Sequence, residues 1–177
     1  KDSKKLSKKK RNILEKYIAI NISISVVILF IVYVLQYFFG MAPCDMCINE
    51  RYPYFIVIIL GTVSYGIKSN TKVVEIITNL IFAIIYFIGL IYSVYHVGIE
   101  RKYWIGSSNC SSKINALDIE TLSSQLMEMP IIRCDEPTFL FNFISIAELN
   151  TIAMGVLLIF SLIAVSYTHL TLPTTTS

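Results

Sequence analysis

Four cysteines are the residues of this sequence best suited to chemistry, and they form two groups. Cys44 and Cys47 make a Cys-x-x-Cys motif, and Cys110 and Cys134 lie further along the chain. A disulfide across Cys-x-x-Cys closes a small, strained ring, which is typical of redox-active pairs. We therefore favour the interpretation that the chain carries two redox pairs, which would act by thiol–disulfide exchange.

Other roles for the cysteines remain open at this point. A structural zinc site usually takes its ligands from two closely spaced pairs, whereas Cys110 and Cys134 are far apart in the sequence. We accordingly predict no metal site. Two inert disulfides that brace loops are an alternative, and buried thiols without a redox role are another.

The residues after the first pair indicate how its thiols could be activated. Proline suits the first position of a helix because its missing N–H needs no partner there. If a helix starts near Pro43, Cys47 lies in its first turn, where free N–H groups favour a thiolate. Arg51 would follow one turn later, placed to stabilise the thiolate or to bind a carbonyl oxygen. Arg51 also has a simpler reading as an anchor at lipid headgroups. Pro53 removes a helical hydrogen bond to Asn49 and would delay or kink the helix.

The composition predicts a membrane protein. Of 177 residues, 55% are hydrophobic and 15% are charged, and the mean hydropathy is +0.65. Soluble domains carry about 25% charged residues. A chain with so few charges is poorly able to cover a globular surface with polar groups, which argues against a soluble enzyme.

The predicted fold is an all-α membrane protein with a four-transmembrane-helix bundle over residues 18–165. Crossing a bilayer takes about 20 apolar residues. Such stretches are Ile18–Phe39, a second from near Cys47 to Gly66, Val73–Tyr95 and Phe143–Val165. The first is too long for the core of a signal peptide, so we expect it to be retained. A long loop before the last span is predicted to carry a short amphipathic helix at Asn115–Met129.

The distribution of cations predicts the orientation. Eight of the 15 Lys and Arg residues lie within residues 1–16. We interpret residues 1–17 as a cytoplasmic flank, not as a nucleic-acid-binding segment. Both termini are then cytoplasmic, and both cysteine pairs lie on the outer side, where disulfides persist. Residues 166–177 are Thr-rich and are interpreted as a non-native or disordered tail.

The motifs together resemble the disulfide bond formation protein B (DsbB) family over about residues 15–165. One motif is Pro43-Cys44-x-x-Cys47-x-x-Glu50-Arg51 before the second span. Another is Tyr95-His96-x-Gly98-x-Glu100, and a third is Arg133-Cys134-Asp135-Glu136-Pro137. The number of spans and the positions of the cysteine loops agree with this resemblance.

The resemblance implies a quinone-dependent thiol oxidase of the bacterial inner membrane. It would reoxidise a soluble, periplasmic thioredoxin-like thiol oxidase and pass the electrons to ubiquinone or menaquinone. By this resemblance Cys110–Cys134 meets the partner, with Cys110 attacked, and the released Cys134 exchanges with Cys44–Cys47.

The resemblance also assigns roles at the acceptor. The Cys47 thiolate would donate electrons to quinone, and Arg51 would contact a ring oxygen. Glu50 and His96 would help to shape the quinone pocket, although a histidine at the end of a span also has a simpler reading as an interfacial polar residue. The alternative function is a non-enzymatic membrane protein whose structural disulfides brace its outer loops.

Overall fold

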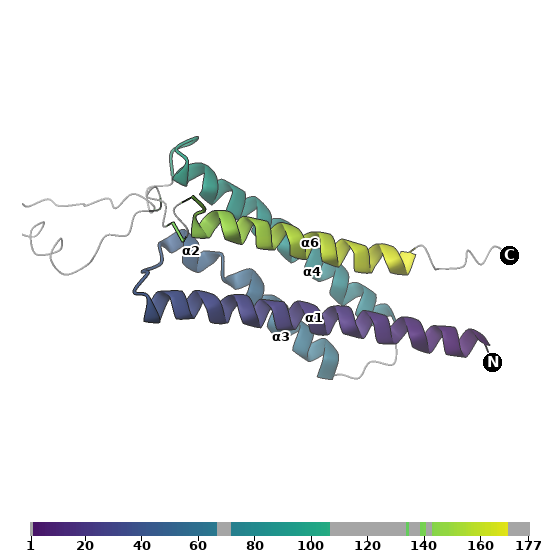
Figure 1. Cartoon of the computed structure of the whole chain (residues 1–177). Helices are drawn as coiled ribbons and strands as arrows, with labels where there is room; N and C mark the ends of the chain where they lie inside the picture. Colours follow the sequence, from purple (N-terminus) through teal and green to yellow (C-terminus); the bar gives the residue numbers. More distant parts are fainter. Residues whose placement is uncertain (1, 67–71, 107–133, 135–138, 141–142, 170–177) are drawn as a thin grey trace, which may run out of the picture.

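The computed structural model describes residues 2–66, 72–106, 134, 139–140 and 143–169, and within these ranges it is helical apart from turns and one isolated bridge. The four longer helices of the described residues alternate in direction, and a short helix, α2, lies at one end of the bundle (Figure 1). The helices are α1 (Asp2–Phe38), α2 (Asp45–Asn49), α3 (Tyr52–Gly66), α4 (Lys72–Glu100) and α6 (Ile146–His169).

Three of these helices are long and apolar enough to cross a membrane. The candidate spans are Glu15–Phe38, Val73–Glu100 and Ile146–Ser166. This confirms the prediction of an all-α membrane protein. Helix α3 is also apolar but has only 15 residues, so the count of four spans stays a prediction, as does the division at residues 17 and 165.

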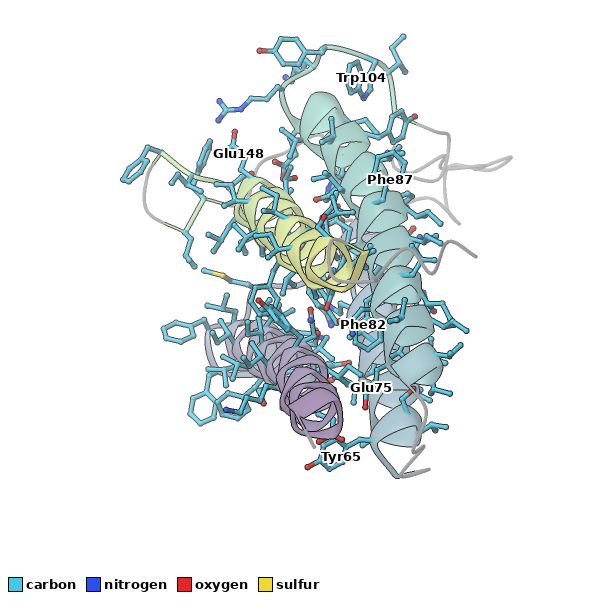
Figure 2. The ribbon with its side chains drawn as sticks, turned by 90° about the vertical axis from the view of Figure 1, so that its right-hand side faces the viewer. Tyr65, Glu75, Phe82, Phe87, Trp104 and Glu148 are labelled. Atoms are coloured by element: carbon cyan, nitrogen blue, oxygen red, sulfur yellow. The ribbon has the colours of Figure 1, made fainter. Side chains whose placement is uncertain are left out.

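The exposure pattern of the bundle differs from that of a soluble protein. Within the part of the chain that the structure describes, five polar side chains are fully buried: Asn21, Ser25, Asn79, Ser93 and Ser161. Large apolar side chains cover the outside; Phe87, labelled in Figure 2, is 54% exposed, while Phe82 on the same helix is fully buried. Polar groups turned inward and apolar groups turned outward are the arrangement that a bilayer favours.

A core of aromatic and aliphatic side chains holds the helices together. Tyr54 and Val57 of α3, Phe82 of α4 and Met154 of α6 belong to it. Helix α3 packs closely on α1, because a Cβ atom at Gly61 would lie 2.7 Å from the Ile22 side chain. Small residues of this kind allow the close helix contacts on which membrane bundles depend.

Helix α6 begins at Ile146, three residues after the predicted start, and a capping box explains the difference. The Glu148 backbone N–H donates to Ser145 Oγ at 3.1 Å, and the Ser145 N–H donates to Glu148 Oε2 at 3.1 Å. This reciprocal pair satisfies two N–H groups at the helix start. The Ser-x-x-Glu pattern is present in the sequence. The predicted start is at Phe143 because the apolar run begins there.

Two other boundaries also differ from the sequence-based expectation. Helix α4 continues to Glu100, five residues beyond Tyr95, so His96 lies within a helix rather than beyond its end. Helix α6 continues to His169, into the stretch interpreted as a tail. The predicted amphipathic helix at Asn115–Met129 and residues 170–177 lie outside the described residues.

We expect Ser145→Ala to destabilise the fold. Ser145 Oγ accepts the Glu148 N–H and donates to Glu100 Oε2 at 2.6 Å. Losing a helix cap and a hydrogen bond to a carboxylate should lower the free energy of unfolding by about 1–3 kcal/mol. Unfolding in a denaturing detergent would measure this change. The matched control is Ser23→Ala, since the exposed Ser23 donates to Ala19 O of its own helix and to no other group among the described residues; an equal loss in both variants would contradict the capping role.

Candidate functional site

A tight turn at the end of α1 brings the first cysteine pair over the bundle. Gly40 adopts a φ of +65°, a left-handed conformation that glycine takes without steric cost. The Met41 N–H donates to Leu35 O at 3.2 Å, which closes the turn. Cys44 then caps α2 with an extended backbone, and its Sγ accepts the Cys47 N–H at 3.2 Å.

The helix that begins at this pair is shorter than a continuous second span would require. It ends at Asn49, and α3 starts anew at Tyr52. The break is where the sequence predicts it, because Pro53 has no N–H to donate to Asn49. Cys47 therefore lies in a first turn, as expected, but this helix has only five residues. Arg51 lies in the break between α2 and α3 and is not one turn along the same helix as Cys47.

The two sulfur atoms of the pair lie close together. Cys44 Sγ and Cys47 Sγ are 2.7 Å apart, so a disulfide of about 2.05 Å needs only a small movement. Cys44 is buried, and Cys47 is half-buried. The hydrogen bond to Cys47 and then burial raise the pKa of Cys44 well above its usual range. Cys44 is therefore held as a thiol, and Cys47 is the more accessible sulfur.

The same pair and His96 contain ligand types that soft metals prefer. Cys44 Sγ, Cys47 Sγ and one His96 ring nitrogen lie within 4.8 Å of one another. Two thiolates on one tetrahedral zinc ion would be roughly 3.8 Å apart, given Zn–S bonds of about 2.3 Å. The observed sulfur separation of 2.7 Å is closer to a disulfide than to that spacing. We therefore assign no metal to this group.

A buried chain of polar side chains extends from Cys44 into the bundle. His96 Nε2 is 3.5 Å from Cys44 Sγ, and His96 Nδ1 is 2.9 Å from Glu50 Oε1. Asn150 Nδ2 donates to Glu50 Oε2 at 2.9 Å, and the Tyr54 hydroxyl donates to Asn150 Oδ1 at 2.7 Å. Glu50 is 6% exposed and His96 is 1% exposed. The contact between His96 and Glu50 joins the two residues that the resemblance predicts at the quinone pocket, and it places His96 inside the bundle.

Arg51 turns toward helix α1. Its Nη1 donates to Gln36 Oε1 at 2.7 Å, and the guanidinium lies 5.1 Å from the centre of the Tyr33 ring. Arg51 is 9% exposed. Its Nε is buried and has no hydrogen-bond partner among the described residues. A buried, partly satisfied guanidinium is a different environment from the headgroup region that an anchoring arginine occupies.

A cavity of about 180 Å³ joins these groups. Apolar side chains of α1 form much of one wall, including Ile28, Leu29 and Leu35, and α6 contributes Leu149 and Ala153. Its polar or titratable side chains are Gln36, Cys44, Cys47, Glu50, Arg51, Tyr54, His96, Glu100, Cys134 and Asn150. An apolar cavity with a small set of convergent polar groups is the usual form of a small-molecule site.

The second cysteine pair is described only in part. Cys134 is 2% exposed and packs in one cluster with Cys44, Met46 and Ile99, so a cysteine from each pair is present in the same cluster. Cys110 lies outside the described residues. The structure thus brings Cys134 to the first pair and leaves the position of Cys110 a prediction.

Ionic contacts close the bundle at this end. Arg101 Nε donates to Glu148 Oε1 at 2.9 Å; Glu148 is labelled in Figure 2. The ion pair links the end of α4 to the start of α6. Trp104 lies at the same end, where its Nε1 donates to Tyr95 O at 2.8 Å. The Arg101–Glu148 ion pair connects the two helices that supply His96 and Asn150, and the Trp104 contact joins α4 to the turn that follows it.

Sequence reasoning had assigned no role to several residues of this site. Gln36 accepts a hydrogen bond from Arg51 and Asn150 donates one to Glu50, so both bond directly to a predicted site residue, and Tyr54 bonds to Asn150. Gln36 and Asn150 are polar residues within apolar spans, and such residues mark functional positions by default. That signal was available for both, whereas Tyr54 was indistinguishable from the other tyrosines near the span ends.

Comparison with known proteins decides the family. A family model described as "Disulfide bond formation protein DsbB" matches residues 15–164, which is most of the chain. The chain belongs to the DsbB family. The resemblance read from the motifs is thereby confirmed, and the chain is assigned to a family of disulfide oxidoreductases. It is also 31% identical over 142 residues to the uncharacterized protein RP370 of Rickettsia prowazekii (strain Madrid E), covering 78% of this chain and 80% of the relative. No solved structure matches the chain.

Proposed function

We propose that this DsbB family member is a quinone-dependent thiol oxidase that passes electrons from a soluble thioredoxin-like thiol oxidase to membrane ubiquinone or menaquinone. The observation that carries the proposal is the position of the Cys44–Cys47 pair on the wall of an apolar cavity that also contains Arg51. The dithiol supplies the electrons, and the cavity suits a flat, lipid-soluble acceptor.

The residues around the cavity fit a quinone. A quinone takes up two electrons and two protons and offers two carbonyl oxygens on an apolar ring. The buried Arg51 Nε has no hydrogen-bond partner among the described residues, and a guanidinium is a strong donor to such an oxygen. The apolar wall from α1 suits the ring. Cys47 lines the same cavity and is the more exposed cysteine of the pair, which supports its role as the electron donor.

The contact between Cys134 and the first pair supports the exchange step. A thiolate at Cys134 would attack Cys44 in the Cys44–Cys47 disulfide, forming a Cys44–Cys134 bond and releasing Cys47 as a thiolate. Cys134 is buried in one cluster with Cys44, and Cys47 packs against that cluster, so the first pair lies close to Cys134. Cys110 is the sulfur that we expect the partner to attack. Once the partner has left, the Cys110 thiolate would attack Cys134 in the Cys44–Cys134 bond, which restores the second pair and releases Cys44 as a thiol.

The proposed orientation puts the cysteines on the periplasmic side of a bacterial inner membrane. The start of α1 and the end of α6 lie at the opposite end of the bundle from α2 (Figure 1). With the basic N-terminal segment in the cytoplasm, as the charge distribution favours, both termini are cytoplasmic. Helix α3 would be the fourth span, and α2 together with the turn between α2 and α3 would supply the additional length that crossing the bilayer requires.

The experiment that tests the function combines the purified protein, a reduced thioredoxin-like thiol oxidase and quinone. Quinol formation is measured by the change in absorbance. We expect it to require both the protein and the reduced partner. The non-enzymatic alternative predicts no thiol exchange and no absorbance change. That result would overturn the proposal.

We expect Cys110→Ala to prevent capture of the partner. If the partner thiolate attacks Cys110, no mixed disulfide can form once this sulfur is removed. The measurement is non-reducing electrophoresis after mixing with a partner variant that keeps only its attacking cysteine. Capture should fall to the level of a cysteine-free control. A mixed disulfide at normal yield would instead identify Cys134 as the attacked sulfur.

A further inference from the structure

The polar chain from Cys44 to Asn150 has a geometry that electron transfer alone does not require. It links a thiol, an imidazole, a carboxylate and an amide through contacts of 3.5, 2.9 and 2.9 Å. Taking a carboxylate out of water costs several kcal/mol unless its partners compensate. Here the buried Glu50 has both oxygens engaged, one by His96 and one by Asn150. A nucleophile, a base and a group that orients the base form the general arrangement of nucleophile activation.

The carboxylate determines which nitrogen of His96 carries a proton. A carboxylate oxygen 2.9 Å from Nδ1 favours a proton on that nitrogen. In the neutral ring Nε2 then carries a lone pair, and Nε2 is the atom that faces Cys44 Sγ at 3.5 Å. The ring is thus oriented to accept a proton from the thiol.

We propose that His96 is the base that removes the proton from Cys44 whenever the Cys44–Cys47 disulfide forms again, and that Glu50 and Asn150 position it. The inference rests on the proposed function, because it concerns the step in which the reduced pair gives up its electrons. A Cys44 thiol and a Cys47 thiolate become a disulfide, releasing two electrons and one proton. The electrons pass to the quinone-class acceptor, and the proton passes from Cys44 Sγ to His96 Nε2.

The electrostatics of Cys44 agree with this role. Its hydrogen bond to Cys47 and its burial raise its pKa, and its contact with His96 acts in the opposite direction. A thiol held so strongly protonated needs a base nearby before it can attack. Other titratable groups line the same cavity and share its field: Cys47, Arg51, Tyr54, Glu100 and Cys134.

Asn150 is the positioning residue that links the base to α3 and α4. Its Nδ2 donates to Glu50 Oε2 at 2.9 Å and to Ser93 Oγ at 3.2 Å. Its Oδ1 accepts the Tyr54 hydroxyl. The amide therefore has partners on both sides, and Glu50 is held with one oxygen toward His96.

The first test titrates Cys44 without any quinone or partner. In a chain carrying Cys47→Ser, Cys110→Ser and Cys134→Ser, Cys44 is the remaining thiol, and its ionisation is followed by ultraviolet thiolate absorption. Adding His96→Gln should raise the midpoint by about one to three pH units, because an imidazolium beside the thiolate is lost. Tyr95→Phe, on the neighbouring exposed residue, is the control and should leave the midpoint unchanged. Coinciding midpoints with and without His96→Gln would overturn the assignment.

A second measurement guards against a folding defect. In the same background, His96→Ala leaves space in the cavity, and added imidazole should restore the lower midpoint if the ring acts as a base. Failure of imidazole to move the midpoint, in a variant that retains its helical circular dichroism, would contradict the role.

The positioning role is read from the tautomer of His96. The chain contains two histidines, His96 and His169, so nitrogen-15 histidine labelling with His169→Gln isolates one ring. We expect the Nδ1–H form in this protein and a shift toward Nε2–H in Glu50→Leu and, to a smaller extent, in Asn150→Leu. An unchanged tautomer ratio in Glu50→Leu would show that the carboxylate does not orient the ring.

These measurements separate the inference from the function on which it rests. A shifted thiol midpoint together with no quinone reduction would leave His96 as the base for Cys44 and overturn the quinone-dependent function. Normal quinone reduction with an unshifted thiol midpoint would leave the quinone-dependent function in place and overturn the role of His96 as the base.

Discussion

Cys47→Ser is expected to abolish quinone reduction while leaving the protein inserted in the membrane. A serine hydroxyl can neither form a disulfide with Cys44 nor supply the two electrons that the acceptor needs. Loss of the residue that carries the chemistry should lower quinol formation by at least about three orders of magnitude, to the uncatalysed background. The measurement is the quinol absorbance change with reduced partner and excess quinone.

The control for this prediction is Met46→Leu, a change of similar volume at the buried residue between the two cysteines. It should retain most of the turnover. Helical circular dichroism and elution volume in detergent check that both variants fold. Normal quinol formation by Cys47→Ser would remove Cys47 from the electron pathway and leave the sulfur chemistry to the remaining cysteines.

Arg51→Ala is expected to raise the apparent KM for quinone by about 10- to 100-fold. The buried guanidinium has a donor without a partner among the described residues and lies on the cavity wall with Cys47. A hydrogen bond to a charged group contributes about 1.5–3 kcal/mol, and 1.4 kcal/mol corresponds to a factor of ten. Steady-state kinetics with varied quinone and saturating reduced partner would measure the change.

The internal control is the KM for the reduced partner, which should stay unchanged in Arg51→Ala. Lys102→Ala replaces an exposed cation at the same end of the bundle and should affect neither KM. A parallel rise in both values for Arg51→Ala would favour a purely structural role at the membrane surface, as an anchoring arginine has.

Some helix boundaries were predictable from neighbouring residues in the sequence, and others were not. The break before α3 was predictable from Pro53, since a missing N–H acts on its own helix. The start of α6 was predictable in principle from Ser145 and Glu148, three residues apart. The extension of α4 to Glu100 had no local signal, because its last turn is held by contacts with other segments, such as the hydrogen bond from Ser145 to Glu100.

The class of the protein and its chemistry were determined by the sequence alone. Hydropathy adds up along the chain, so long apolar runs with few charges identify a membrane protein without any knowledge of packing. The Cys44–Cys47 spacing is local as well, and it predicts a pair that can form a disulfide.

Only the tertiary structure decided which residues meet at that pair. Glu50, His96 and Asn150 come from separate parts of the chain, and their contact depends on how each helix is rotated and shifted against its neighbours. These quantities depend on packing across the bundle, which includes the close approach at Gly61 and the buried core around Phe82. A sequence pattern identifies the polar residues of a helix, and the packing of the other helices determines which of them face one another.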